Sequence, residues 1–525
     1  MSEQFLNTSE MLDIQISCIN LPMELYSGCK IVGSIGTHGD FKQFYQTDVF
    51  FNNINPVFNQ KCTIIYHFEG RQKLQFLVYS ADPVTKEEKY LVGKALFNLH
   101  DLLLLGGVGT AAIERDSSKV DQKQATSQIC IRIIKSKREL ATLIKFKASG
   151  LSSQNEYPLN PYLIMQLFDK ENPTNIVLLH KSEIIRGSQN PNWKSFVTLT
   201  KYLNLYKDSM IKVDIFNYNP NTMDSLIGSF VTTFFQLVQG QALKFSLNSI
   251  TGAKLNDMVV DVVEFKPYEL TSFTDLLLKE KLRIHCTIGI DFTAFNGPIE
   301  DPYSCHHYQD GETNEYQKIL ENIFEDLSNC DLSRKVCVFG FGGRNKKSQM
   351  TSHLSPLECE ETKKPYFVRF NSLVNSYKKF LNENALSIPC DFSDIIHQVK
   401  GMAKASKKNL RNEKIYFLLV ILTRGCVKNT KKIVDAIVGC STLPLSIVVV
   451  PIGNIKNPFT SIQDTIFTNI FLPQLKDSDN NPLLREVITL INPSLSNNCQ
   501  LSQYIMQHIP RHAELWSHNF SSTPK

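Results

Sequence analysis

Asp291 and Thr293 end an apolar run in the stretch IGIDFTAFNG, residues 288–297. A carboxylate followed two residues later by a hydroxyl offers the hard oxygen ligands that Mg²⁺ and Ca²⁺ prefer. A third oxygen ligand would suit the next alternate position, but the chain has Phe295 there. Three interpretations stay open at this point: a working ion site, a degenerate one, or an ordinary strand end.

The elements that would position these residues begin near residue 270, where apolar strands alternate with amphipathic helices. In the helix predicted at 314–327, apolar residues recur at the spacing of one helix face, and Asp391 is the expected N-cap of another helix. Continuously apolar strands separated by helices predict a largely parallel sheet covered on both faces, with sites at the carboxyl ends of the strands. Asp291 ends one such strand (282–291), and Arg424 follows another (414–423).

The first half of the chain contains an internal repeat. Residues 52–68 are echoed by 186–202, and residues 74–97 are echoed by 211–234. Each copy has short β-rich runs separated by Asn, Pro, Gly and Asp, which is typical of an antiparallel sandwich. We predict a first sandwich at about 10–137, a second at 138–265, an α/β domain at 270–512 and a tail at 513–525.

Composition limits the class of protein. The 525 residues are 42% hydrophobic and 20% charged, which suits folded domains, and the net charge of +5 is too small to predict a nucleic-acid partner. The 13 cysteines include no CxxC pair, and the N-terminal stretch MSEQFLNTSEMLD is polar and acidic rather than signal-like. The apolar runs are shorter than the ~20 residues of a spanning helix. We therefore expect a cytoplasmic protein, associated at most peripherally with a membrane.

Several segments together resemble the copine family. They are residues 273–297, FGFGGR at 339–344, LPLSIVVVPIGN at 443–454, and the paired elements NPVF/NPNW and YLVG/SLIG. The resemblance implies two C2 domains followed by a von Willebrand factor A-like domain. It also implies calcium-dependent phospholipid binding, most naturally at the plasma membrane. In this family the A-like domain is thought to bind protein partners and carries a metal-ion-dependent adhesion site.

The adhesion-type metal site is incomplete when it is mapped onto this sequence. Asp291 and Thr293 match the first loop of the family motif, whereas Phe295 replaces its Ser, Cys390 its second-loop Thr and Arg424 its third-loop Asp. A phenyl ring, a thiol and a guanidinium are unsuitable ligands for Mg²⁺, so magnesium is not expected. We expect the Arg424 guanidinium to pair with Asp291, directly or through water. The alternative is that Arg424 points into solvent and Asp291 caps a neighbouring helix or loop.

The calcium loops that the resemblance implies are also depleted of carboxylates. In the second sandwich, the family's loop aspartates fall on Asn160, Asn217 and Asn219, and only Asp224 keeps a charge. In the first sandwich, Ser27 and Gly28 lie near the first ligand position, Ser80 takes a later one, and Asp82 remains, with Glu87, Glu88 and Lys89 nearby. Because calcium affinity depends on the number of charged ligands, we expect calcium binding to be weak or absent.

A basic stretch offers a membrane contact that needs no calcium. Cations attract anionic lipid by about 1 kcal/mol each near a membrane surface, and salt screens this attraction. The alternative is a solvated face on a stable sandwich. The candidate lipid-binding residues are Lys135, Lys137, Arg138, Lys145 and Lys147.

Other motifs predict little chemistry. SCHHY at 304–308 is predicted to be a loop, and GFGG at 340–343 a close backbone turn, since it lacks the lysine and serine of a P-loop. No nucleophilic triad is evident, so we predict a non-enzymatic adaptor between an anionic phospholipid membrane and a protein partner. The alternative is a cytosolic interaction scaffold with decayed ion sites and no membrane role.

Overall fold

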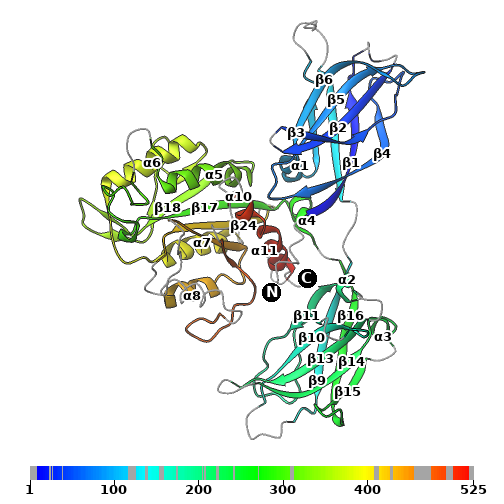
Figure 1. The fold of residues 1–525 in the computed structure, drawn as a ribbon, viewed down its shortest axis with the longest axis vertical. Coiled ribbons are helices and arrows are strands. Elements are labelled where there is room, and N and C mark those ends of the chain that lie inside the picture. Colours follow the sequence, from blue (N-terminus) through cyan, green and yellow to red (C-terminus); the bar gives the residue numbers. More distant parts are fainter. Residues whose placement is uncertain are drawn as a thin grey trace. The chain divides into compact units, whose positions relative to one another are not determined.

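The computed structural model describes most of the chain, in two compact units. One unit is Met1–Lys137 with Thr271–Lys525, and the other is Arg138–Leu270. Figure 1 shows two regions rich in β-strands and one α/β region. The residues described are 9–22, 25, 28–37, 39–115, 126–135, 140–152, 159–172, 176–203, 205, 209–219, 224–240, 243–269, 271–307, 312–406, 413–425, 430–453, 475–491 and 501–518.

Residues 9–135 form the first sandwich, from two antiparallel sheets with strand orders β4-β1-β8-β7 and β3-β2-β5-β6. The alternation of residues in β1 explains why these sheets pack face to face. One face of the strand is buried, because more exposed residues alternate with Leu12, Ile14, Ile16 and Cys18. The elements are β1 (Ser9–Ile19), β2 (Cys29–Thr37), β3 (Asp40–Gln46), β4 (Val57–His67), β5 (Lys73–Ala81), β6 (Glu88–Asn98), α1 (Leu99–Leu104), β7 (Val108–Ala112) and β8 (Gln128–Lys135).

Residues 140–269 form the second sandwich. Its strands follow the order β11-β10-β13-β14-β15-β16-β9-β12, and a single residue pair, Ser229 with Asn248, joins the two four-stranded halves. The elements are β9 (Leu140–Ser149), β10 (Pro161–Asp169), β11 (Ile176–Lys181), β12 (Phe196–Leu199), α2 (Thr200–Leu203), β13 (Ser209–Asn217), β14 (Ser225–Thr232), α3 (Phe234–Val238), β15 (Lys244–Asn248) and β16 (Lys254–Glu269).

Residues 271–518 form the α/β domain, whose central strands pair in parallel in the order β18-β17-β24-β25-β26. The strands are β17 (Arg283–Asp291), β18 (Val336–Phe341), β24 (Ile415–Thr423), β25 (Leu445–Pro451) and β26 (Ile488–Leu490). Short antiparallel strands β21 (Ser355–Pro356) and β22 (Tyr366–Phe367) pair with β18, and β19 (Gly343–Asn345), β20 (Thr351–Ser352) and β23 (Asn384–Leu386) form a separate small sheet.

Helices cover both faces of the parallel sheet, as the sequence predicts. One hydrophobic cluster packs α5 (Glu315–Asn329), α6 (Phe370–Glu383), α10 (Leu501–Met506) and α11 (Ile509–Trp516) against one face, and it includes α4 (Phe273–Leu278). A second cluster packs α7 (Ser393–Ser406) and α8 (Thr430–Val438) against the other face (Figure 1). The chain therefore consists of two all-β sandwiches followed by an α/β domain.

Two element ends lie beyond the predicted domain limits. Strand β16 continues to Glu269, past the predicted limit at 265. Helix α11 continues to Trp516, whose indole is buried, so the helix overlaps the predicted tail. Among the helices described, none is both long and apolar enough to cross a membrane.

Candidate functional site

Asp291 lies at the carboxyl end of β17, beside the end of the parallel strand β24. The carboxylate is fully buried and accepts hydrogen bonds on both oxygens. Oδ1 accepts from the main-chain N–H of Thr293 at 2.8 Å. Oδ2 accepts from the Thr423 hydroxyl at 2.7 Å and from the main-chain N–H of Arg424 at 3.2 Å. The strand ends therefore meet at this carboxylate, as the parallel topology requires.

The other predicted site residues come together around Asp291, with one change of role. Cys390 lies with its sulfur 3.9 Å from Oδ2 of Asp291 and 3.9 Å from the Thr423 hydroxyl. Arg424 contacts Asp291 through its main chain, whereas its guanidinium Nη1 lies 3.0 Å from the sulfur of Cys305. The guanidinium, which was expected to pair with Asp291, is instead directed to the Cys305 thiol, and Arg424 contacts Asp291 through its main-chain N–H.

Phe295 belongs to the hydrophobic packing rather than to the polar site. Its side chain is partly buried and packs against the cluster that includes Phe341, Cys390 and Phe392. The residue that replaces an oxygen ligand therefore extends the core beneath the loop. The burial of an aromatic ring favours this arrangement because it removes apolar surface from water.

A buried polar network that sequence reasoning missed holds the loop after β17. His306 Nε2 lies 2.8 Å from the carbonyl oxygen of Asp291, and its Nδ1 lies 2.6 Å from the Tyr377 hydroxyl. Since a carbonyl only accepts, Nε2 carries the proton and Nδ1 accepts from Tyr377. Burial lowers the pKa of His306 to about 3, which favours this neutral form. The loop prediction for SCHHY holds for the described residues 304–307, but it gave no sign of this role.

Asn296 completes the support of the same loop. Its side-chain amide donates to the carbonyl oxygens of Asp291 at 3.1 Å and Thr293 at 3.0 Å, and its oxygen accepts from the Tyr316 hydroxyl at 2.9 Å. Gly297 follows with φ of +87°, a conformation that favours glycine. The Asn-Gly pair of IDFTAFNG is therefore explained by loop geometry.

The GFGG segment is a close backbone turn, as predicted. Gly342 has φ of +78°, and a Cβ added there would lie 2.3 Å from Cγ2 of Thr293. A Cβ on Gly340 would lie 2.7 Å from the ring of Phe292. The glycines thus allow the end of β18 to approach the Asp291 loop.

The groups around Asp291 do not fit a magnesium ion. One carboxylate is present, its oxygens already accept protein hydrogen bonds, and the neighbouring side chains are a thiol and a partly buried phenyl ring. Burial raises the pKa of Asp291, and donors from Thr293, Thr423 and Arg424 offset part of this rise. The buried Thr293 hydroxyl offers one further oxygen, which is far from an octahedral ligand set.

The loops at one end of the second sandwich are linked to each other by their own side chains. Oδ1 of Asn217 accepts from the main-chain N–H of Asn160 at 2.7 Å, and Oδ1 of Asn160 accepts from that of Gly187 at 3.2 Å. The Asp224 carboxylate accepts from the Asn219 main-chain N–H at 3.0 Å and from the Tyr162 hydroxyl at 2.7 Å. The four predicted loop residues are therefore close together, joined by hydrogen bonds that need no ion.

Lysines neutralise the corresponding carboxylates of the first sandwich. Asp82 accepts from the main-chain N–H groups of Val84 and Thr85 and lies 3.1 Å from Nζ of Lys89. These hydrogen bonds lower the pKa of Asp82 to about 2. Glu88 pairs with Lys30 at 2.7 Å. At Gly28 a Cβ would lie 2.1 Å from the carbonyl oxygen of Ala81, so this position cannot carry a ligand side chain without rearrangement.

The predicted basic residues are only partly described. Lys137 and Arg138 lie outside the described residues, and Lys135 is described only as part of the backbone of β8. Lys145 and Lys147 lie on β9 opposite Glu264 and Asp261 of β16, and Nζ of Lys147 is 3.2 Å from the Asp261 carboxylate. Acidic partners therefore reduce the positive potential of this face.

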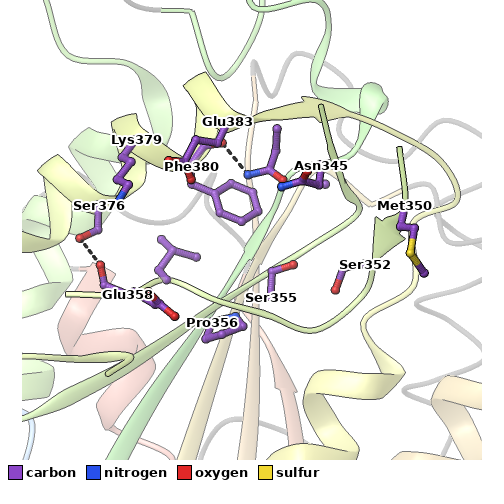
Figure 2. Close-up of a pocket in the computed structure, with 13 residues that line it drawn as sticks. Asn345, Met350, Ser352, Ser355, Pro356, Glu358, Ser376, Lys379, Phe380 and Glu383 are labelled. Carbon is purple, nitrogen blue, oxygen red and sulfur yellow. Dashed lines mark hydrogen bonds between the residues drawn. The ribbon is translucent and has the colours of Figure 1, made fainter. Parts of the chain in front are cut away.

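Two cavities lie in the α/β domain away from the Asp291 carboxylate. One of about 320 Å³ lies between α6 and the short strands, with Ser355, Lys379 and Glu383 in its wall (Figure 2). Another of about 290 Å³ borders the loop after β17, beside Ala294 and Leu386. None of the predicted metal-site residues lines either cavity.

Comparisons with known proteins agree with this arrangement. A family model for the Copine domain matches residues 304–524, and one for the C2 domain matches 16–112 and 140–248. Among solved structures, the chain is similar to "BON1-C2B", with 23% identity and a TM-score of 0.22, over 25% of this chain and 93% of that chain. It is also similar to the calcium-bound pair of C2 domains of Extended-Synaptotagmin 2, with 14% identity and a TM-score of 0.18, over 50% and 97%. With two C2 domains followed by a Copine domain, the chain has the domain architecture of the copine family.

Proposed function

We propose that this protein is a non-enzymatic peripheral membrane adaptor that binds anionic phospholipid without calcium and a protein partner through the α/β domain. The C2 and Copine domains support a membrane-associated role in phospholipid binding and protein interaction in general. The anionic cytoplasmic leaflet of the plasma membrane is the surface that suits it. The lipid headgroup is recognised by charge and not through a bridging ion.

One observation supports the proposal that binding does not depend on an ion. Asp82, Asp224 and Asp291 each accept hydrogen bonds or an ion pair from protein groups on both carboxylate oxygens. A divalent ion at any of these three positions would have to displace these donors. Each position would offer the ion one such carboxylate as a ligand. Because calcium affinity rises with the number of charged ligands, such sites hold calcium weakly at best.

The absence of enzymatic activity is part of the proposal. Within the described residues, the arrangement most like a nucleophilic triad is at Ser446, whose hydroxyl lies 3.0 Å from Nδ1 of His512, while Nε2 of His512 lies 3.9 Å from Glu486. Ser446 is 0% exposed and His512 1% exposed, so a substrate cannot reach the hydroxyl. The group instead links α11 to β25 through the Ser446–His512 contact, and the same serine contacts the Tyr416 hydroxyl of β24 at 2.7 Å.

Vesicle flotation of the full chain tests the proposal. We expect binding to vesicles of phosphatidylcholine with phosphatidylserine in the presence of chelator, loss of binding at high salt, and no gain from calcium. Neutral phosphatidylcholine vesicles are the control for charge, and Asp224→Asn is the control for a calcium loop. Binding that needs calcium and is lost in Asp224→Asn would refute the proposal.

A second candidate is an interaction scaffold without a membrane role. Two ion pairs favour this candidate: Lys147 with Asp261 at 3.2 Å and Lys266 with Glu264 at 3.1 Å. They reduce the positive potential of the basic face of the second sandwich. In the flotation experiment, this candidate predicts no binding to either vesicle under any condition, with the chain still folded.

A further inference from the structure

The first sandwich and the α/β domain share one continuous hydrophobic cluster. Helix α4, which begins the α/β domain, packs against the sandwich: the ring centroids of Phe68 and Phe273 are 4.8 Å apart in an edge-to-face arrangement. A Cβ added to Gly107 would lie 2.8 Å from Cδ2 of Leu278, so the glycine allows a close approach of the two parts. Apolar burial of this kind stabilises an interface in the same way as a domain core.

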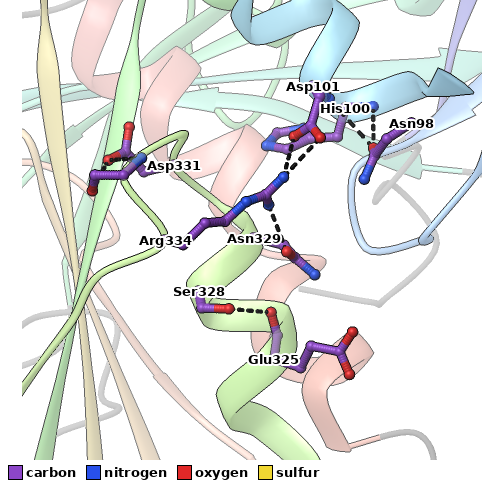
Figure 3. A network of polar contacts seen from close by, with 9 residues as sticks. Asn98, His100, Asp101, Glu325, Ser328, Asn329, Asp331 and Arg334 are labelled. Atoms are coloured by element: carbon purple, nitrogen blue, oxygen red, sulfur yellow. Dashed lines mark hydrogen bonds and ion pairs between the residues drawn. The ribbon is translucent and has the colours of Figure 1, made fainter. Parts of the chain in front are cut away.

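Two groups of ion pairs also join the first sandwich to the α/β domain. Nη2 of Arg334 lies 2.7 Å from each oxygen of Asp101 on α1, and its Nη1 donates to Asn329 at 2.5 Å (Figure 3). Arg71 of the first sandwich pairs with Glu325 at 3.0 Å and also with Asp326, both on α5. The sandwich thus contributes one acid and one base, and the α/β domain contributes the complementary charges.

Both the first sandwich and the α/β domain contribute a carboxylate that accepts a hydrogen bond from a main-chain N–H group at the start of α4. Oε1 of Glu10, on β1, accepts from the main-chain N–H of Thr274 at 3.0 Å. Oε1 of Glu514, on α11, accepts from the main-chain N–H of Phe273 at 2.7 Å. The first N–H groups of a helix have no partner within the helix, so each carboxylate replaces a bond that would otherwise go to water. Separation of the two parts would expose these groups together with the apolar contact.

We propose that the first sandwich is permanently docked on the α/β domain and moves with it as one body. The second sandwich forms its own compact unit, placed between these two parts along the chain. The docking follows from complementary charges, shared helix capping and shared apolar burial at one contact. It does not depend on whether the protein binds lipid. The docked sandwich acts as a structural part of the α/β body rather than as a free membrane-binding module.

A charge-swap cycle on the full chain tests the docking. We compare Asp101→Arg, Arg334→Asp and the double variant by amide hydrogen exchange of α1 and α4. Arg334 has φ of +53°, which aspartate tolerates. Each single variant should speed exchange in α4 by about three- to tenfold, since a partly exposed charged hydrogen-bonded pair is lost. The double variant should recover most of the protection.

Two controls make the outcome specific. Glu315→Lys removes an exposed ion pair of α5 with Lys318, 3.3 Å apart, and should leave α4 exchange unchanged. Strands β10 and β13 of the second sandwich should keep their exchange rates in every variant. A second cycle with Arg71→Asp and Asp326→Arg covers the case in which an Asp101 variant does not fold. Coupling in either cycle supports the docking, and wild-type exchange of α4 in all single variants would overturn it.

Discussion

The Thr423 hydroxyl donates a hydrogen bond of 2.7 Å to Oδ2 of Asp291 and accepts one of 3.0 Å from the main-chain N–H of Gly425. Thr423 is the last residue of β24 and is fully buried, as is Asp291. A protein hydroxyl therefore reaches the carboxylate oxygen that an ion would need. This bond connects two strand ends whose loops form the same edge of the α/β domain.

Replacing Thr423 by valine should destabilise the α/β domain by about 2 kcal/mol. Valine is similar in size to threonine but has no hydroxyl, so the buried Asp291 carboxylate loses a hydrogen-bond donor. The two tryptophans allow a domain-specific measurement: with Trp193→Phe as background, the fluorescence of Trp516 reports urea unfolding of the α/β domain. Thr351→Val at an exposed position is the matched control and should change stability by less than about 0.5 kcal/mol. Equal stability of the two variants would contradict the assigned bond.

His306 should make the α/β domain sensitive to acid. Its pKa falls to about 3 in the folded chain because of burial, from about 6.5 when unfolded. The stability that neutral His306 contributes is therefore complete above about pH 6.5 and is lost as pH falls toward 3. His306→Phe should reduce the slope of unfolding free energy against pH by about 1.4 kcal/mol per pH unit between pH 4.5 and 6. The same Trp516 signal measures it, and an unchanged slope would show that His306 is not buried neutral.

The magnesium site should return only when its ligands are restored. Calorimetric titration of the wild-type chain with Mg²⁺ or Mn²⁺ should show no binding at millimolar concentration. The triple variant Phe295→Ser, Cys390→Thr and Arg424→Asp supplies two hydroxyls and a second carboxylate, which suit a hard cation. We expect it to bind Mg²⁺ measurably. Micromolar binding by the wild type that disappears in Asp291→Ala would contradict this prediction.

Removing an acidic partner should strengthen binding to anionic vesicles. Asp261 lies 3.2 Å from Nζ of Lys147 and 4.0 Å from Nζ of Lys244. Asp261→Asn leaves both lysines with uncompensated charge, and we expect about fivefold tighter binding, corresponding to about 1 kcal/mol. The gain should vanish at high salt. Asp40→Asn in the first sandwich makes the same change in net charge and should have no such effect, whereas an equal gain would indicate a nonspecific charge effect.

Patterns in the sequence were sufficient to predict the architecture and part of the candidate site. Continuous apolar strands alternating with helices predicted the parallel sheet, and this placed Asp291 at the correct edge. Cys390, which the family motif places at a lost ligand position of the same site, lies 3.9 Å from Asp291. Thr423 could have been found with the same argument, since it ends the strand that pairs with β17.

The supporting groups could not be predicted because their roles arise from tertiary contacts. His306 looked like part of a polar loop, yet its ring stacks on Tyr316 and Phe292, at centroid distances of 4.3 and 5.2 Å. Nothing local in the sequence indicates that α5 and the loop would enclose it. The direction of the Arg424 guanidinium likewise depends on Cys305, which is 119 residues away in the chain.

The side chains of His306 and Asn296 fix the loop after β17 through its own carbonyl groups. A ligand approaching that edge of the domain would therefore find it preorganised, with little conformational entropy left to lose on association. Recognition there would proceed by rigid docking.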